Sequence, residues 1–253
     1  MKYYEKLVEI GGFSREELVG ITGSLAAAKS IIYDYQKKGY IERVRHNLYV
    51  TISLETHQPI LSRYQIGSRI FPDACISHHS AFEVYGYANQ VFYEMYVATA
   101  SRFADFDYDG VSYHRVAPKY EGQVEVFGGI KVTSLERTVV DSVNEVGKIA
   151  GLEELVWCIS LMPTLNEDKL LDVLKHYRCG VLYQKCGYLL EGMNGTLGLS
   201  KKFFEECSKN ISKSKRYFMS ERESLVWHGK WNLYAPASIQ SLVSKGVGDY
   251  DAI

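Results

Sequence analysis

The sequence has few cysteines, and none of them forms a pattern that a disulfide framework or a structural zinc site requires. Five cysteines occur among 253 residues, an odd number, and no two are spaced as a Cys-x-x-Cys pair. Structural zinc sites draw on closely spaced cysteine and histidine pairs, and disulfide frameworks on an even number of cysteines. We therefore expect reduced, mostly buried thiols, and neither a metal site nor a cofactor.

Long hydrophobic runs are also absent. No segment approaches the ~18 consecutive apolar residues of a membrane span, although hydrophobic residues make up 46% of the chain and can build packed cores. Residues 1–5 lack the apolar stretch of a signal peptide. We expect a cytoplasmic protein without a membrane partner, organised as one large domain or two ordinary ones.

An excess of charge of either sign is missing too. The formal net charge is -1, from 29 Lys and Arg residues against 30 Asp and Glu residues. A nucleic-acid-binding protein needs only a local basic face. Residues 23–50 carry five basic and two acidic residues, and residues 201–222 carry seven basic and three acidic residues. The basic charge is therefore concentrated in two patches.

The N-terminal part of the chain carries the start and stop signals of three helices, the first over residues 1–10. Ser14 and Glu17 form a capping box, which begins a second helix that we expect to end at Gly20. Ser24 can cap a longer third helix, in which apolar residues recur three or four apart and predict a buried stripe. The stripe comprises Leu25, Ala28, Ile32 and Tyr35.

A hairpin follows these helices. Residues 40–44 and 48–50 alternate like strands, and residues 45–47 form the turn between them. This order is typical of a winged helix-turn-helix, in which one helix enters the major groove of DNA and the wing contacts phosphates or the minor groove. We predict a DNA-binding domain of this kind over residues 1–51.

Polar and basic residues lie opposite the apolar stripe of the third helix and on the hairpin. Lys and Arg side chains neutralise phosphates, and polar side chains on a recognition helix reach base edges. These residues are therefore the candidates for DNA contact. They are Ser24, Ala27, Lys29, Ser30, Tyr33 and Lys37 on the helix, and Arg43, Arg45 and His46 on the hairpin.

Residues 59–253 predict a larger mixed α+β domain, joined to the first by a polar linker over residues 52–58. A helical segment over residues 60–71 is followed by short strands and by a helix that a second capping box, Thr133 to Glu136, begins. From residue 152 the pattern turns helical, with a strand pair near the C-terminus. The predicted fold class is thus α+β, a winged helix-turn-helix followed by this larger domain.

Two polar clusters in the larger domain have a structural and a functional explanation. His78 and His79 are neighbours, and neighbours on a helix point about 100° apart, so packing explains them better than joint ligation of a metal. Arg137 and Asp141 lie four residues apart on an expected helix and can form an ion pair. We expect no catalytic residue here, and action of the pair on a partner remains the alternative.

Four segments carry more specific motifs. Residues 45–50 read Arg-His-Asn-Leu-Tyr-Val, and residues 76–81 read Ile-Ser-His-His-Ser-Ala before Gly86. Residues 133–141, Thr-Ser-Leu-Glu-Arg-Thr-Val-Val-Asp, are the most specific, and Leu-Leu-Glu at residues 189–191 follows Gly-Tyr. Together these segments, which span most of the chain, resemble the AbiEi antitoxins of type IV toxin–antitoxin systems. The family more often has Arg-Gly where this chain has His-Asn, but asparagine also accepts a left-handed conformation.

The resemblance implies two activities of a non-enzymatic protein in phage defence by abortive infection. Such antitoxins repress their own operon by binding promoter repeats, and they counteract a nucleotidyltransferase-like toxin through the C-terminal domain without a stable complex. We therefore expect an antitoxin and transcriptional repressor, with promoter DNA and such a toxin as partners. The second basic patch is then a solvated face or a surface for the antitoxin activity or for nucleic acid. Its residues are Lys201, Lys202, Lys209, Lys213, Lys215 and Arg216.

The alternative is a winged-helix protein fused to a nuclease-like or ligand-sensing domain. Glu125 and Lys131 lie on neighbouring predicted strands, but their spacing departs from the compact Glu-x-Lys pattern of metal nucleases. The 20 tyrosines can line a ligand pocket, although regularly spaced aromatic residues more often fill a core.

Overall fold

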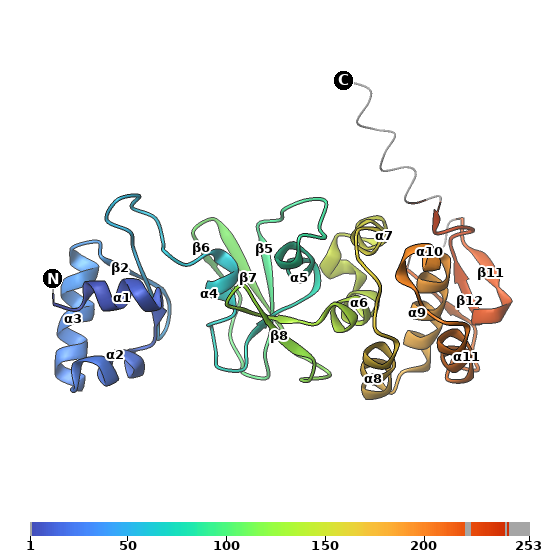
Figure 1. Ribbon diagram of the computed structural model, residues 1–253, viewed down its shortest axis with the longest axis horizontal. Coiled ribbons are helices and arrows are strands. Elements are labelled where there is room, and N and C mark those ends of the chain that lie inside the picture. The colour runs from blue at the N-terminus through green and yellow to red at the C-terminus, as the bar shows by residue number, and fades with distance from the viewer. Residues whose placement is uncertain (1, 221–223, 241, 243–253) are drawn as a thin grey trace, which may run out of the picture. The chain divides into compact units, whose positions relative to one another are not determined.

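The computed structural model describes residues 2–220, 224–240 and 242 (Figure 1). It is a mixed α+β protein with several sheets, as the sequence predicts. The chain divides into two compact units whose segments alternate along the sequence. The first comprises Met1–Ile76, Tyr93–Val116 and Gly128–Lys131, and the second comprises Ser77–Phe92, Ala117–Phe127 and Val132–Ile253. None of the helices in the described ranges is both long and apolar enough to cross a bilayer.

Three helices and a small antiparallel sheet make up the N-terminal part of the first unit. The sheet has the strand order β1-β3-β2, and β2 and β3 form the predicted hairpin. The elements are α1 (Tyr4–Ile10), β1 (Gly12–Phe13), α2 (Arg15–Thr22), α3 (Leu25–Lys37), β2 (Ile41–Arg45) and β3 (Leu48–Thr51). Buried side chains from these helices and from β1 and β2 form one apolar cluster.

The predicted capping box at the start of α2 is confirmed. The Ser14 hydroxyl accepts from the Glu17 backbone N–H at 3.2 Å, and the Glu17 carboxylate accepts from the Ser14 N–H at 2.7 Å. The predicted end at Gly20 is wrong, because α2 continues to Thr22 and ends at Gly23, which takes the left-handed conformation. A glycine inside a helix costs about 1 kcal/mol relative to alanine but leaves the backbone hydrogen bonds in place.

The rest of the first unit contains a sheet against which α4 (Arg63–Gly67) packs. Its strands lie in the order β6-β7-β5-β4, with β5 and β7 parallel and the other pairs antiparallel. They are β4 (Cys75–Ile76), β5 (Glu94–Ala98), β6 (Phe106–Tyr108) and β7 (Val111–Val116). The helix expected over residues 60–71 is thus limited to α4, and β6 is not among the predicted strands. Ile52 forms an isolated bridge with Pro59, so the expected linker is a closed loop.

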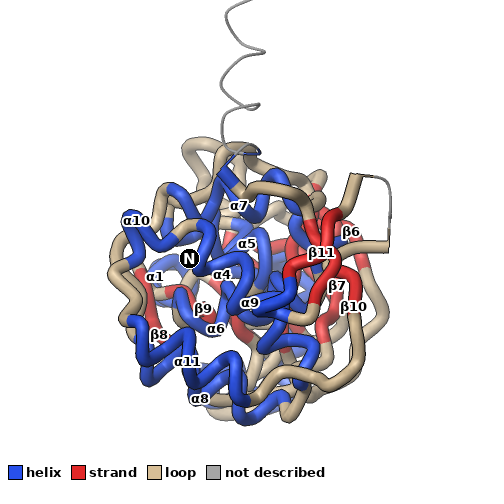
Figure 2. The backbone as a smooth tube through the Cα atoms, turned by 90° about the vertical axis from the view of Figure 1, so that its right-hand side faces the viewer, coloured by secondary structure: helices blue, strands red, loops and turns tan. Residues whose placement is uncertain are grey.

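The second unit is mainly helical. Helices α8, α9 and α11 pack against one another (Figure 2), and a small sheet has the strand order β10-β12-β11. The helices are α5 (His78–Tyr85), α6 (Leu135–Asn144), η1 (Val146–Ile149), α7 (Leu152–Ser160), α8 (Glu167–Tyr177), α9 (Gly180–Gly192), α10 (Asn194–Leu197), α11 (Lys201–Lys209) and η2 (Gly229–Trp231). The strands are β8 (Val124–Phe127), β10 (Arg216–Tyr217), β11 (Val226–His228) and β12 (Leu233–Ala235), and β9 (Ile130–Thr133) begins in the first unit.

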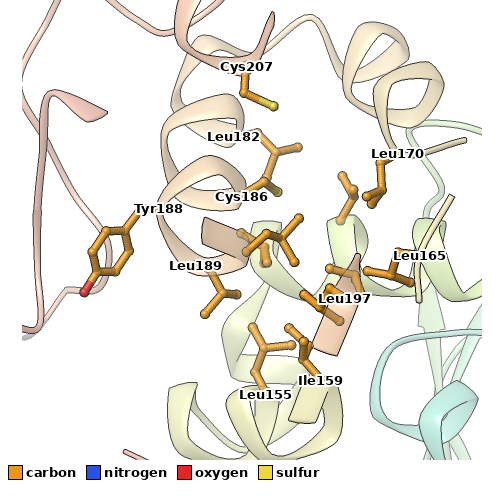
Figure 3. Close-up of a cluster of buried hydrophobic side chains, with 14 of the residues drawn as sticks. Leu155, Ile159, Leu165, Leu170, Leu182, Cys186, Tyr188, Leu189, Leu197 and Cys207 are labelled. Carbon is orange, nitrogen blue, oxygen red and sulfur yellow. The ribbon is translucent and has the colours of Figure 1, made fainter. Parts of the chain in front are cut away.

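A large cluster of buried apolar side chains joins these helices (Figure 3). Leu155 and Ile159 come from α7, and Leu182, Cys186 and Leu189 from α9, and each is at most 2% exposed. The expectation of free, mostly buried thiols is confirmed. Cys75, Cys158, Cys186 and Cys207 are buried, and Cys179 is half-buried.

Candidate functional site

Helix α3 presents one polar side to solvent. Lys29, Ser30, Tyr33 and Lys37 are all exposed, and Tyr33 is 68% exposed. Their spacing of one, three and four residues places them together on one side of the helix. Two ammonium groups, a hydroxyl and a phenol therefore face outward over about two turns.

The N-terminal end of α3 differs in detail from the predicted pattern. The Ser24 hydroxyl caps the helix by accepting from the Ala27 N–H at 3.2 Å. Ala27 itself is half-buried, whereas Ala26 is exposed on the same side as Lys29. Leu25 does not belong to the buried stripe, because it is the first residue of the helix and is 50% exposed. The residues predicted for DNA contact therefore omit Leu25 and Ala26, which are both exposed. An apolar residue at a helix start can contact a thymine methyl group.

The opposite side of α3 holds the helix on the core. Ala28, Ile32 and Tyr35 are at most 8% exposed and belong to one cluster with Leu7 and Leu18. The predicted stripe is confirmed at these three positions. Each large apolar side chain buried in this way contributes about 1.5–3 kcal/mol, so the exposed side of α3 has a fixed orientation.

The turn of the β2–β3 hairpin is tied to the start of α2. Asn47 takes the left-handed conformation with a φ of 59°. Its side-chain oxygen accepts from the Arg15 N–H at 3.0 Å, and its amide donates to the Glu16 carboxylate at 2.5 Å, which lowers the pKa of Glu16. Arg43 and His46 on the same hairpin are exposed. The hairpin thus offers two basic side chains on a braced turn.

Arg45 lies in a different environment from Arg43 and His46. Its guanidinium carbon is 4.9 Å from the ring centre of Phe71, 5.1 Å from that of Phe103 and 5.7 Å from that of Phe106. Burial among these rings lowers the pKa of Arg45, and its Nη1 is buried without a hydrogen-bond partner in the described part of the chain. The structure therefore does not place Arg45 with the exposed candidates, although the sequence grouped them together.

A pocket of about 790 Å³ lies between the hairpin turn and the segment after α4 in the same unit. Phe13 and Phe71 line it together with three cationic residues, Arg45, Arg69 and Lys131. Two of the cations are engaged, because Arg69 donates to backbone carbonyls of residues 10 and 12, and Lys131 donates to that of residue 72. The carboxylates of Glu16 and Glu17 line the same pocket, and the buried Arg45 nitrogen is a group there that a hydrogen-bond acceptor would satisfy.

His79 stands between two carboxylates in the second unit. Its Nε2 is 3.1 Å from Glu154, its Nδ1 is 3.1 Å from Glu83, and the Cys158 thiol donates to Glu154 at 3.5 Å. Burial by itself lowers the pKa of His79, but the hydrogen bond to Glu154 and the nearby Glu83 carboxylate outweigh it and raise that pKa. Burial also raises the pKa of Cys158, which keeps the thiol protonated.

In the described part of the chain, His79, Glu154 and Cys158 are the residues that could together hold a metal ion. One ligand atom from each of His79, Glu154 and Cys158 lies within 4.8 Å of the others. Sequence reasoning missed this group because it paired His79 with its neighbour His78, whereas Glu154 and Cys158 come from a helix more than seventy residues later. Within the group, the His79 Nε2 is hydrogen-bonded to Glu154 and the Cys158 thiol donates to the same carboxylate. His78 instead lies 3.4 Å from Glu145 and lowers the pKa of that carboxyl to about 2.

The predicted pair of Arg137 and Asp141 forms on α6, with Nε 3.3 Å from the carboxylate. Arg137 is 1% exposed and also donates to the Gly122 carbonyl at 2.7 Å, and Tyr177 donates to Asp141 at 2.5 Å. These bonds within the fold account for both charges. The pair therefore has the structural role that spacing favours.

The predicted capping box that precedes this pair is wrong. Ser134, not Thr133, caps α6 by accepting from the backbone N–H of the third helical residue at 3.2 Å. Glu136 turns the other way and accepts from the Asn166 N–H at 3.0 Å. Thr133 and Ser134 are both hydroxyl residues that can begin the helix. The contact of Glu136 with the Asn166 backbone leaves Ser134 as the residue that caps α6.

The second basic patch is divided between α11 and the segment that follows it. Lys201 lies 3.9 Å from Glu205, and Lys209 lies 3.6 Å from Glu206, so both form ion pairs on α11. The remaining predicted residues are exposed. They are Lys202, Lys213, Lys215 and Arg216.

Glu125 and Lys131, the residues considered for a nuclease centre, are engaged separately. Glu125 pairs with Lys169 at 2.9 Å, and Lys131 donates to the Pro72 carbonyl at 2.6 Å. Neither side chain is held free for a metal or a scissile phosphate. The nuclease alternative therefore gains no support from the geometry.

The whole chain is similar in fold to a solved structure. It matches the RV2827C protein from Mycobacterium tuberculosis with a TM-score of 0.67, over 97% of this chain and 93% of that chain, at 15% sequence identity. At this identity the likeness concerns the fold alone. No protein-family model matches the sequence, and no curated protein is significantly similar to it.

Proposed function

We propose that the protein is a DNA-binding transcriptional repressor and an AbiEi-type antitoxin of the cytoplasm, without enzymatic activity. The N-terminal module is then a winged helix-turn-helix, with α3 as its recognition helix and the β2–β3 hairpin as its wing. The observation that carries this proposal is the exposed side of α3, where Lys29, Ser30, Tyr33 and Lys37 stand on a helix that the core holds in place. Such a side supplies phosphate contacts and base contacts together.

The charge and size of this surface fit duplex DNA. An α-helix fills the major groove, which is about 12 Å wide, and the exposed Arg43 and His46 extend the basic surface to the hairpin. Each Lys or Arg that neutralises a phosphate releases counterions, which makes binding strongly salt-dependent. Two copies bound side by side would require promoter repeats one helical turn or a multiple apart.

The antitoxin activity belongs to the larger α+β part of the chain in this proposal. The resemblance of residues 76–81, 133–141 and 189–191 to AbiEi antitoxins supports it. The partner is a nucleotidyltransferase-like toxin that the protein counteracts without a stable complex. Co-expression with a nucleotidyltransferase-like toxin tests this half, because the chain must restore growth and this effect must not depend on the α3 residues.

A promoter–reporter assay tests the repressor half. The protein's own upstream DNA drives the reporter, and the chain is supplied in trans as the wild type or as Lys29→Ala/Tyr33→Ala. We expect repression by the wild type and its loss in the double variant. Lys6→Ala is the matched control, because Lys6 is an exposed lysine of α1 in the same module. Equal repression by all three proteins, or by none, would contradict the proposal.

The second candidate function is a ligand-responsive regulator, and the pocket beside the hairpin favours it. This pocket combines Phe13 and Phe71 with the buried, unpartnered nitrogen of Arg45. A carboxylate or phosphate ligand would satisfy that nitrogen. Thermal unfolding with a panel of carboxylates and nucleotides, for the wild type and Arg45→Leu, would reveal a ligand that stabilises only the wild type.

A further inference from the structure

The small sheet near the C-terminus carries a row of three aromatic side chains, one from each strand. Tyr217 of β10 is directly opposite Tyr234 of β12, and Tyr234 is directly opposite Trp227 of β11. The ring centres of Tyr217 and Tyr234 are 4.9 Å apart at an interplanar angle of 15°, and those of Trp227 and Tyr234 are 5.1 Å apart at 51°. The three rings therefore form one continuous row across the sheet.

This row lies on the solvent side of the sheet. Leu233 and Ala235, the neighbours of Tyr234 on β12, are buried in the core of the second unit, and successive strand residues point to opposite faces. Tyr217 is 40% exposed and Trp227 is 39% exposed. Contiguous exposed apolar surface is uncommon on a monomeric protein in water, and it marks sites of interaction.

Positive charge without an acidic partner lies next to the row. The Nζ of Lys215 is 4.8 Å from the ring centre of Trp227, and Lys213, two residues earlier in the chain, is also exposed. Within the described residues, no acidic side chain forms an ion pair with Lys213 or Lys215. The lysines of the patch at Lys201 and Lys209, in contrast, are paired with glutamates of α11. Lys215 is therefore a cation without an acidic partner in contact with a ring of the row.

Exposed rings on a sheet combined with free cations are what single-stranded nucleic acid requires. Unpaired bases stack on aromatic side chains, and the backbone phosphates contact lysine and arginine. A duplex hides its base faces and cannot use the rings. Cross-strand packing alone would also explain three neighbouring aromatic residues, but it does not explain their exposure next to Lys215, a lysine without an acidic partner.

We propose that this sheet binds single-stranded nucleic acid, with bases stacked on the row of Tyr217, Tyr234 and Trp227 and phosphates held by Lys213 and Lys215. The site is distinct from the α3 surface and goes beyond the DNA-binding and antitoxin functions proposed above. It uses only residues of the second unit. RNA and single-stranded DNA share the chemistry that the site recognises.

Fluorescence anisotropy of the full chain tests the proposal. The probes are labelled oligo(dT) and oligo(rU) of about 12 nucleotides, within the span of such sites, and a random duplex of the same length. We expect both single strands to bind more tightly than the duplex, and a preference between them identifies the natural nucleic acid. Trp227→Ala and Tyr217→Ala are each expected to weaken binding by roughly 5- to 100-fold.

Matched variants separate this role from a purely structural one. Trp227→Phe keeps a stacking ring and should bind within a few-fold of the wild type. Tyr93→Ala removes an aromatic residue that is 73% exposed in the first unit and should have no effect. Lys215→Gln should lower the salt slope by about 0.7, as the loss of one phosphate contact on a single strand does, whereas Lys201→Gln should leave it unchanged.

Two results would overturn the proposal: equal affinity for single strands and random duplex, or equal affinity of Trp227→Ala, Tyr93→Ala and the wild type for the single strands. If circular dichroism shows that Trp227→Ala is unfolded, the salt slopes of Lys215→Gln and Lys201→Gln test the proposal by themselves. The Lys29→Ala/Tyr33→Ala variant must keep its single-strand binding. Failure of promoter repression is therefore distinguishable from failure of this proposal.

Discussion

Arg43 and Arg45 show how far the role of a residue depends on its contacts with segments that are distant in the sequence. Both belong to the same basic hairpin, and the sequence assigns both to DNA. Arg43 is exposed, whereas Arg45 stacks among Phe71, Phe103 and Phe106. These rings come from later segments that no local pattern connects to the hairpin. The exposed lysines of α3 were predictable because helical periodicity alone separates them from the core.

Alanine substitutions of the two arginines should therefore affect different properties. Arg43→Ala should weaken DNA binding, and Arg45→Ala should lower the stability of the fold. We expect Arg43→Ala to lower the salt slope of promoter binding by about 0.9, because one phosphate contact is lost, and to leave stability unchanged. Arg45→Ala should leave the slope unchanged and lower the free energy of unfolding by about 1–2 kcal/mol, because the cation–π contacts are lost. Salt-dependent anisotropy and urea unfolding measure the two quantities. A fall in the slope for Arg45→Ala would show that Arg45 leaves its ring contacts to bind DNA.

The raised pKa of His79 predicts a pH dependence of stability. Because the folded state holds the His79 proton more tightly than the unfolded chain, this contribution is fully present below the unfolded pKa of about 6.5 and is lost as the pH rises through the folded pKa. Burial by itself raises the pKa of Glu154, but the hydrogen bond and the charge of His79, with smaller contributions, outweigh it and lower that pKa, so the contribution of Glu154 is lost as the pH falls below about 4.3. The cluster is therefore most stabilising between these limits.

Urea unfolding of the wild type and His79→Gln over a series of pH values measures this dependence. The difference in the free energy of unfolding between the two proteins should be largest near pH 6, roughly between the two reference pKa values, and should shrink as the solution becomes alkaline. A difference that stays constant from acidic to alkaline pH would contradict the assignment of a protonated His79 between Glu83 and Glu154.

At the scale of elements, the helix starts were the most predictable features. Ser14 and Ser24 each cap a helix by accepting a hydrogen bond from the backbone N–H three residues on, as the sequence predicts. The chain also turns helical at Leu152, where α7 begins, as the pattern predicts. Strands β6 and β10 were missed because they are three and two residues long, too short for any alternation to be visible.

Helix α9 contains a close approach that periodicity does not reveal. A Cβ atom added at Gly187 would lie 2.1 Å from the indole ring of Trp231, whereas one added at Gly195 of α10 meets nothing within 4 Å. We expect Gly187→Ala to lower the free energy of unfolding by about 1–3 kcal/mol, because the core has no room for the extra carbon. Gly195→Ala is the matched control and should be neutral or stabilising by up to about 1 kcal/mol. Thermal unfolding of the two variants compares them, and equal midpoints would contradict the packing of α9 against Trp231.

At the scale of the whole molecule, the fold class was predictable and the course of the chain was not. Helical and strand patterns establish a mixed α+β protein. The chain nevertheless contributes three separate segments to the first unit, and it pairs β5 with β7 in parallel. Pairings between distant segments leave no periodic trace in the sequence. For the same reason the predicted boundary at residues 51–59 differs from the division into units, and the row of Tyr217, Tyr234 and Trp227 came only from the structure.

The central claim is that α3 is the DNA-contacting surface of the protein. The most direct measurement is an anisotropy titration of the full chain on its own upstream DNA and on random duplex, at several salt concentrations. The wild type, Lys29→Ala/Tyr33→Ala and the control Lys6→Ala are compared. The account predicts preference for the upstream DNA, a loss of about tenfold or more in the double variant, and a salt slope lower by about 0.9. Equal binding of the upstream and random duplexes, or equal affinity of all three proteins, would contradict it.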